Sequence, residues 1–225
     1  MTPMTLPLVD IYPLVYEPFD RFAAVRDSPE MLPLLPAVEI GFVIHGPLNH
    51  AHRAVNLHNN LLPSLIEAKL SALQSFKAAR AEMPRLQDIP AIYEYRNSYP
   101  HYDAARVDTE MATYGKPLHP DQVLFHGGEY PRDSTGMPLT RFTRPEVFST
   151  SLCAQVAATH SSYHTPKDVW IVRIASGSTT QAIVFGHKTQ MLGHEREVLL
   201  AKNVQFTLRG IHPDGEYTLY EVDAL

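Results

Sequence analysis

The pattern of apolar and turn-forming residues changes near Asp121, and this change limits the folds that the chain can adopt. The strongest helical pattern comes before it, and short apolar runs broken by Gly, Pro, Asp and Ser come after it. Such runs are typical of strands joined by turns. Helices followed by strands, rather than alternating with them, predict an α+β fold. No internal repeat or low-complexity tract is visible.

Residues 64–81 carry the clearest helical pattern, because their apolar side chains recur at helical spacing. Ser64 with Glu67 three residues later matches a capping box and predicts that the helix starts there. We expect residues 84–120 to be mostly irregular and tyrosine-rich. The other expected elements are helices near 48–59, 102–114 and 152–162 and a strand within 37–44.

The first 40 residues differ from the rest in holding seven prolines. Prolines disfavour helix and sheet, so we expect residues 1–40 to be an extended or partly disordered lead. Residues 41–118 are then a helical portion and 119–225 a β-rich core. With 225 residues, 44% of them apolar, the chain can bury a real core, and we expect 41–225 to form one compact domain.

Composition narrows the classes of partner and compartment. The net charge is −5 with no basic stripe, which disfavours nucleic acid without excluding it. The single cysteine, Cys153, cannot form an internal disulfide, and we expect it to be a small buried thiol. No run is long enough to span a membrane, and residues 1–10 do not resemble a signal peptide. We expect a cytoplasmic protein, or one delivered into a host cell by a dedicated secretion system.

Two glutamates near the end of the chain are the first sign of chemistry. Glu195 and Glu197 stand two residues apart at the start of an apolar run. In a strand such residues point to the same face, so both carboxylates would share one space. Close like charges raise at least one pKa, an arrangement found more often at functional sites. A solvated strand edge is the alternative interpretation.

Two segments further upstream also carry polar residues at the end of an apolar run. Residues 123–128 end in His126 and Gly127, and residues 148–152 contain Ser149, Thr150 and Ser151. Taken singly, each has an ordinary explanation, a packed histidine near a turn or a Ser/Thr pair at a strand end. In this order and at this spacing, the three segments resemble the mono-ADP-ribosyltransferases of bacterial toxins, effectors and phages. The resemblance covers residues 120–209, including expected strands at 169–174 and 204–208.

The resemblance implies a fold and an activity. The fold is a split β-sheet core with an N-terminal helical portion. The activity is that of a pentosyltransferase, a glycosyltransferase that cleaves NAD and moves ADP-ribose onto a protein side chain with release of nicotinamide. NAD is then a co-substrate, no metal is needed, and the partner is a protein target in a host cell. Secretion and a role in virulence belong to the same resemblance.

The resemblance also implies residue roles. Glu197 is the catalytic glutamate, which accepts a hydrogen bond from the 2′-hydroxyl of the nicotinamide ribose and stabilises an oxocarbenium-like transition state. Glu195 faces the acceptor and favours arginine, since relatives that modify asparagine carry glutamine there. Ser149 supports Glu197, and Ser149, Thr150 and Ser151 build the nicotinamide site, with Thr150 expected on the opposite face of the strand.

His126 stands where the Arg-Ser-Glu branch of the family has arginine. The poly-ADP-ribose and diphtheria-toxin-like branch has His-Gly there, which implies that His126 binds the adenine-side ribose and the Gly127 backbone binds the nicotinamide amide. Gly127 would need no side chain because the ligand approaches closely. Three arginines could hold the pyrophosphate instead: Arg132, Arg141 or Arg144. The loop 185–194 would contact the target, through Met191 or Leu192.

Other functions stay open at this stage. The acceptor could be a threonine or serine hydroxyl, a nucleic acid or water. The chain could also be an inactive module that binds a partner through its tyrosine-rich segment 93–114. His50, His52 and His58, or His160 and His164, have spacings that suit a metal, but without a cysteine cluster or a His-Glu-x-x-His motif we expect no metal site.

Overall fold

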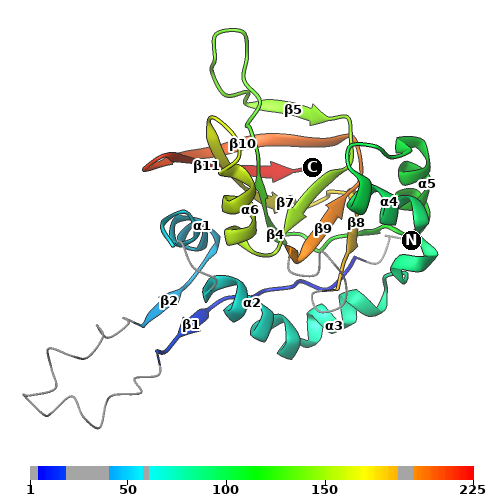
Figure 1. The fold of residues 1–225 in the computed structure, drawn as a ribbon, viewed down its shortest axis with the longest axis horizontal. Coiled ribbons are helices and arrows are strands. Elements are labelled where there is room, and N and C mark those ends of the chain that lie inside the picture. Colours follow the sequence, from blue (N-terminus) through cyan, green and yellow to red (C-terminus); the bar gives the residue numbers. More distant parts are fainter. Residues whose placement is uncertain (1–4, 19–40, 58–60, 187–194) are drawn as a thin grey trace, which may run out of the picture.

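The computed structural model describes residues 5–18, 41–57, 61–186 and 195–225 (Figure 1). The helices are α1 (Pro47–Asn56), α2 (Leu61–Ala72), α3 (Gln74–Ala81), the 3₁₀ turn η3 (Leu86–Asp88), α4 (Pro90–Ser98), α5 (Ala104–Tyr114) and α6 (Ala154–Ser161). The strands are β1 (Leu14–Tyr16), β2 (Phe42–Ile44), β3 (Lys116–Pro117), β4 (Val123–Gly127), β5 (Arg141–Arg144), β6 (Phe148–Ser151), β7 (Lys167–Ile174), β8 (Gln181–Val184), β9 (Glu197–Leu200), β10 (Val204–Asp214) and β11 (Tyr217–Ala224).

A large mixed sheet forms the body of the molecule. Its strands follow the order β3-β8-β9-β6-β4-β7-β11-β10-β5. Neighbouring strands are antiparallel except β7 and β11, which are parallel. The sheet is weakest between β4 and β6, where Phe125 opposite Ser151 is the single pair in register. This joint divides the sheet into two halves, β3-β8-β9-β6 and β4-β7-β11-β10-β5.

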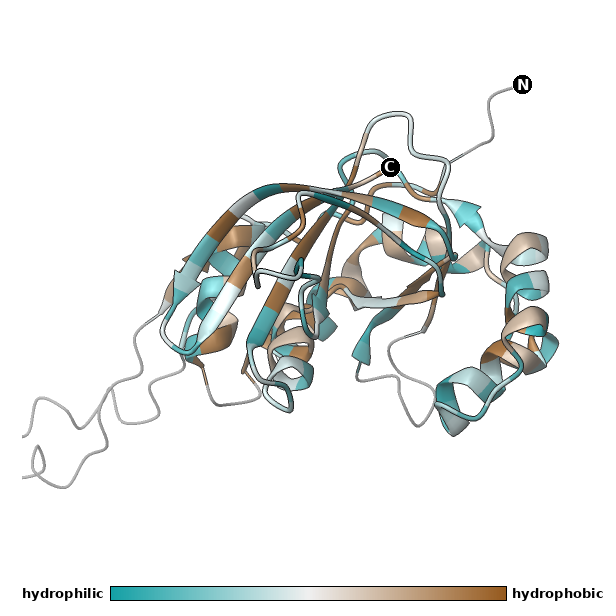
Figure 2. Ribbon diagram, turned by 90° about the horizontal axis from the view of Figure 1, so that it is seen from above, coloured by the Kyte–Doolittle hydropathy of each residue, from teal (hydrophilic) through white to brown (hydrophobic). Residues whose placement is uncertain are grey.

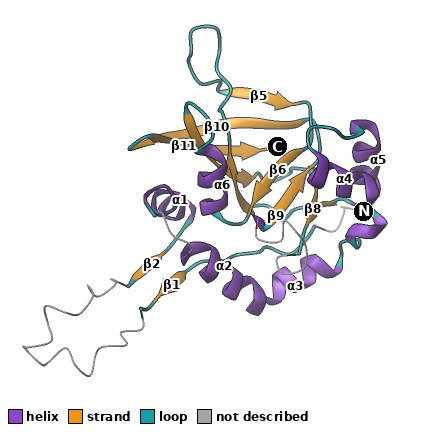
Figure 3. Ribbon diagram, in the orientation of Figure 1, coloured by secondary structure: helices purple, strands orange, loops and turns teal. Residues whose placement is uncertain are grey.

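Helices lie against both halves of the sheet (Figure 3). The helix α6 packs on β4 and β7, and α1 packs on α6. The helix α5 contacts β8 and pairs with α4. The buried residues form one core, in which the fully buried Trp170 packs edge-to-face against Phe142 and Phe206. The α+β prediction is confirmed.

The residues near the N-terminus are extended and partly buried. Leu6 and Leu14 belong to the core, and β1 pairs with β2. The Val9 backbone exchanges two hydrogen bonds with the Gln122 side chain, at 2.9 and 3.2 Å, which anchors this segment to the sheet. Residues 19–40 of the proline-rich stretch lie outside the described residues. The division of the chain at residues 40 and 118 stays a prediction.

Several local expectations were wrong. The helix expected at 64–81 is two helices, because Leu73 has extended backbone angles between α2 and α3. Since α2 already includes Leu61, Ser64 lies inside it and is not its cap. The helix α4 occupies part of the stretch expected to be irregular. Its start at Pro90 follows the usual preference for proline in the first helical turn.

In the long strands at one end of the sheet, successive side chains point to opposite faces of the sheet. Polar and apolar residues alternate along them, as Figure 2 shows in teal and brown. In β10 the buried Val204 and Phe206 flank the exposed Gln205, the period of two that a sheet covered on one face requires. Among the described residues, none of the helices has both the length and the apolar character needed to cross a membrane.

Candidate active site

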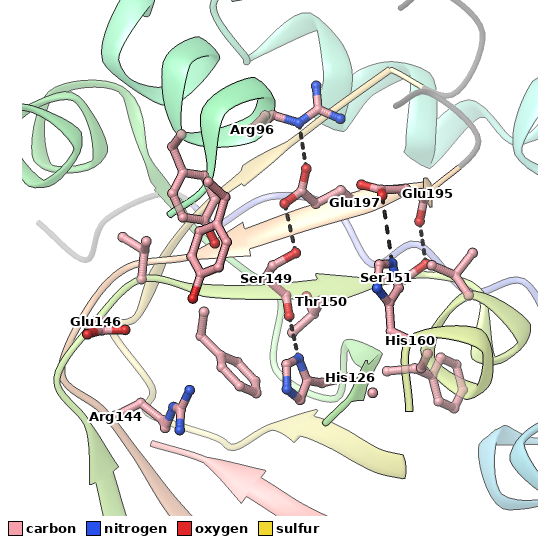
Figure 4. Close-up of a pocket in the computed structure, with 18 of the residues that line it drawn as sticks. Arg96, His126, Arg144, Glu146, Ser149, Thr150, Ser151, His160, Glu195 and Glu197 are labelled. Carbon is pink, nitrogen blue, oxygen red and sulfur yellow. Dashed lines mark hydrogen bonds and ion pairs between the residues drawn. The ribbon is translucent and has the colours of Figure 1, made fainter. Parts of the chain in front are cut away.

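A pocket of about 380 Å³ opens beside the joint between β4 and β6 (Figure 4). Side chains from β4, β6, α4 and α6 line it, together with those that begin β9. Its volume falls in the range of small-molecule sites. His126, Ser149 and Glu197, which lie far apart in the sequence, all line this one pocket.

Glu197 is the first residue of β9 and is only 4% exposed. Its Oε2 accepts from Arg96 Nε at 2.6 Å, and its Oε1 accepts from Ser149 Oγ at 2.8 Å. Burial raises the pKa of Glu197, whereas the Arg96 guanidinium and the Ser149 hydroxyl act to lower it. The repulsion by Glu195 adds to the raised pKa of Glu197 but is a smaller cause than burial.

Glu195 lies on the rim of the same pocket, but not for the reason that the sequence suggested. The strand β9 starts only at Glu197, and Arg196 before it has a left-handed backbone (φ 49°). Ser151 Oγ donates to the Glu195 carbonyl at 2.5 Å and fixes this turn. Glu195 Oε1 lies 3.7 Å from Nε2 of His160 on α6, and this contact raises the pKa of His160.

The three residues of the Ser-Thr-Ser segment have separate tasks. Ser149 bonds the Glu197 carboxylate. Thr150 is buried, and its hydroxyl donates to the Val198 carbonyl across the β6–β9 pair, at 2.5 Å. Ser151, besides holding Glu195, accepts from the Cys153 N–H at 3.0 Å, just before α6 begins. Cys153 is buried, as expected from the sequence.

His126 stands near the end of β4 with its ring between Phe148 and Trp170, at centroid distances of 4.2 and 5.1 Å. Nδ1 lies 2.8 Å from the Ser149 carbonyl oxygen, which can only accept, so Nδ1 carries the proton. Burial lowers the pKa of His126 to about 4. The neutral ring therefore leaves Nε2 as a hydrogen-bond acceptor.

Gly127 lines the pocket, but its missing side chain has another cause than ligand approach. A Cβ at this position would lie 1.8 Å from the Ala157 carbonyl oxygen and 2.8 Å from the Ser161 nitrogen. The strand β4 and the helix α6 are therefore in backbone contact here. The glycine lets α6 sit against the strand, which places His160 at the rim of the pocket.

Of the three arginines considered for a pyrophosphate, one lines the pocket. Arg144 does so, with its guanidinium 5.5 Å above the Phe148 ring. Arg132 instead bonds the buried Asp168 carboxylate at 2.9 Å, and Arg141 is exposed on the edge strand β5. The loop residues Met191 and Leu192 lie outside the described residues.

Two features of the pocket were not predicted from the sequence. One is Arg96, which reaches Glu197 from α4. The other is a wall of tyrosines, in which Tyr95 packs edge-to-face on Tyr102 and Tyr99 stacks on Tyr102. The tyrosine-rich composition was visible, but its place beside the pocket was not. A buried glutamate in an apolar strand needs a cation, and this could have prompted a search for Arg96.

Solved structures with a similar fold are ADP-ribosyltransferases. The Vis toxin of Vibrio splendidus, an ADP-ribosyltransferase, superposes with a TM-score of 0.52 at 16% identity, over 77% of this chain and 90% of the toxin chain. Vis in complex with an inhibitor gives a TM-score of 0.50 at 16% identity, over 80% and 90% of the two chains. The chain has the ADP-ribosyltransferase fold. The search against family models found no match, nor did the search of curated proteins.

In the described part of the chain no group of three or more His, Cys, Asp or Glu residues is arranged to hold a metal ion. His50 is buried against Tyr12, and His52 pairs with Asp214 at 2.7 Å. His58 lies outside the described residues. The polar groups of the pocket include the three carboxylates Glu146, Glu195 and Glu197, together with hydroxyls, imidazoles and arginines.

Proposed function

We propose that this protein is a mono-ADP-ribosyltransferase that cleaves NAD and transfers ADP-ribose to a protein side chain, with arginine as the first acceptor to test. The observation that carries the proposal is the convergence of His126, Ser149 and Glu197 on one pocket in a chain of this fold. A continuous series of hydrogen bonds links the three, from His126 to the Ser149 carbonyl and from the Ser149 hydroxyl to Glu197 (Figure 4).

The reaction breaks the bond between the ribose C1′ and the nicotinamide nitrogen. Nicotinamide leaves with the bonding electrons, and positive charge develops on the ribose, as in glycoside cleavage. An ionised Glu197 accepts a hydrogen bond from the 2′-hydroxyl and offsets that charge. An acceptor nitrogen or oxygen then attacks C1′ and loses its proton.

Glu195 is the group that we assign to the acceptor. Its side chain is 20% exposed at the rim, within reach of a molecule in solution, whereas Glu197 lies deeper. A carboxylate can bind the two parallel N–H groups of a guanidinium, which makes arginine a natural acceptor. His160, next to Glu195, is the nearby group that could take up the released proton.

The remaining groups of the pocket suit the rest of the dinucleotide. His126 Nε2 can accept from a hydroxyl of the adenine-side ribose, and the Gly127 backbone can bind the nicotinamide amide. Arg144 is the arginine that we assign to the pyrophosphate, since it lines the pocket and makes no ion pair within the described ranges. No step in this scheme needs a metal. The toxin-like context, a host protein target and delivery into a host cell belong to the same proposal.

Mass spectrometry of a cell lysate incubated with the protein and NAD tests this function. We expect ADP-ribose on arginine side chains, and none when NAD is omitted. ADP-ribose on serine, threonine or nucleic acid would overturn the arginine assignment and keep the transfer. Binding of NAD with no attachment and no free nicotinamide would contradict the whole proposal and favour a partner-binding module.

A further inference from the structure

We propose that Arg96 is the positioning residue that keeps the Glu197 carboxylate ionised and directed into the pocket. This inference rests on the proposed function, because it concerns the glutamate assigned there to NAD cleavage. It adds a residue from the helical portion of the chain, 101 positions away from Glu197, to the residues that act on this carboxylate.

Arg96 and Glu197 form a buried ion pair. The side chains of Arg96 and Glu197 are 3% and 5% exposed, and Nε to Oε2 measures 2.6 Å. A guanidinium stays protonated in proteins, so its buried positive charge requires a negative partner. Glu197 supplies that partner only in its ionised form. Arg96, which is always charged, therefore favours the ionised form of Glu197.

Arg96 and Ser149 hold the Glu197 carboxylate from two sides. The Arg96 guanidinium lies 4.2 Å from the centre of the Phe185 ring, and the Phe185 N–H donates to the Glu197 carbonyl at 3.1 Å. Phe185 directly follows β8 and Glu197 begins β9, so Arg96 contacts residues at the ends of two neighbouring strands. Ser149 holds Oε1 from the other side. With one oxygen held by each neighbour, the carboxylate cannot rotate freely, and it stays among the groups that line the pocket.

Other charged groups also lie near Glu197. Glu195 raises the pKa of Glu197, and burial, followed by the charge of Glu197, raises the pKa of Tyr95 on α4. His160 on α6 is farther away, with a pKa that Glu195 raises more than Glu197 does. The positive charge of Arg96 acts on Arg80 on α3, and Arg80 donates a hydrogen bond to the Val184 carbonyl instead of a carboxylate. Arg96 is thus the cation that acts most directly on Glu197.

The consequence for catalysis follows from the charge. Only an ionised Glu197 can offset positive charge on the ribose. Without Arg96, only the Ser149 hydrogen bond would oppose the rise in the Glu197 pKa that burial causes, and Glu197 would take up a proton at a higher pH. The acid limb of the pH–activity profile should therefore move to higher pH.

The test compares nicotinamide release across pH for the wild type, Arg96→Gln and Arg96→Lys. We expect Arg96→Gln to lose at least about tenfold at pH 7, to shift its acid limb upward by about one pH unit or more, and to recover at alkaline pH. Arg96→Lys, which keeps the charge, should keep the wild-type limb. A loss that is equal at every pH, or the same shift in Arg96→Lys, would show a merely structural role and overturn the inference.

A second readout does not depend on activity. Infrared spectroscopy follows the carbonyl stretch of a protonated carboxylic acid, and the Glu197→Gln variant identifies the band of this residue. We expect no such band in the wild type at pH 7 and its appearance in Arg96→Gln. A protonated Glu197 in the wild type would overturn the inference even if Arg96→Gln does not fold. If the infrared result holds and the wild type releases no nicotinamide, the proposed function fails and the assignment of Arg96 stands.

Discussion

At the scale of single residues, the two glutamates share a pocket but differ in their surroundings. Glu197 is buried between Arg96 and Ser149, and Glu195 lies on the rim beside His160. The sequence predicted that these side chains would be close, but from a strand that does not include Glu195. Arg96 could not be predicted, because a single arginine in a helix carries no local sign of a partner far along the chain.

This difference between the glutamates predicts that a variant of Glu195 can lose transfer of ADP-ribose while it keeps nicotinamide release. Glu195→Gln should lower transfer to an acceptor about 100-fold, because a charged partner for the acceptor is lost. Nicotinamide release into water should stay within about fivefold of wild type, because Glu197 keeps its own partners. Both rates are measured on the same samples, with Glu94→Gln on the exposed face of α4 as the control. Equal loss of both activities would contradict the division of labour.

At the scale of elements, the sequence patterns predicted whether a segment is a helix or a strand better than they predicted where it begins and ends. Periodicity predicted a helix over 64–81, where the structure has α2 and α3, and the helix expected near 102–114 is α5. The capping box at Ser64 was misleading, because α2 already includes Leu61. The helix α4 was missed because its tyrosines give no clear apolar stripe. This miss matters, since α4 carries Arg96 and one wall of the pocket.

The contact between β4 and α6 leads to a prediction about stability. Gly127→Ala should destabilise the protein by about 3 kcal/mol, because the added Cβ would overlap the Ala157 carbonyl and neither backbone can move freely. Gly46→Ala is the matched control, since no atom lies within 4 Å of its added Cβ, and it should change stability by less than about 1 kcal/mol. Thermal or denaturant unfolding measures both. Similar unfolding curves for the two variants would show that α6 does not depend on Gly127.

At the scale of the whole molecule, the pocket exists because the sheet is almost divided. The strands β4 and β6 meet through the pair Phe125 and Ser151, and β4, β6 and β9 bring their polar residues to this joint. The family resemblance carried by the three segments predicted that they converge. It was not enough to predict the strand order or the helix that closes the far side of the pocket. Those depend on pairings between distant residues.

The central claim is that Glu197 in this pocket promotes cleavage of NAD. The most direct measurement is nicotinamide release from NAD by the purified protein, for the wild type, Glu197→Gln and Glu197→Asp, each first shown to be folded. We predict measurable release by the wild type and a loss of about 100-fold or more in Glu197→Gln. Glu197→Asp keeps the charge for Arg96 but shortens the reach to the ribose, and should lose about tenfold or more. Release that is unchanged in both folded variants would contradict the account.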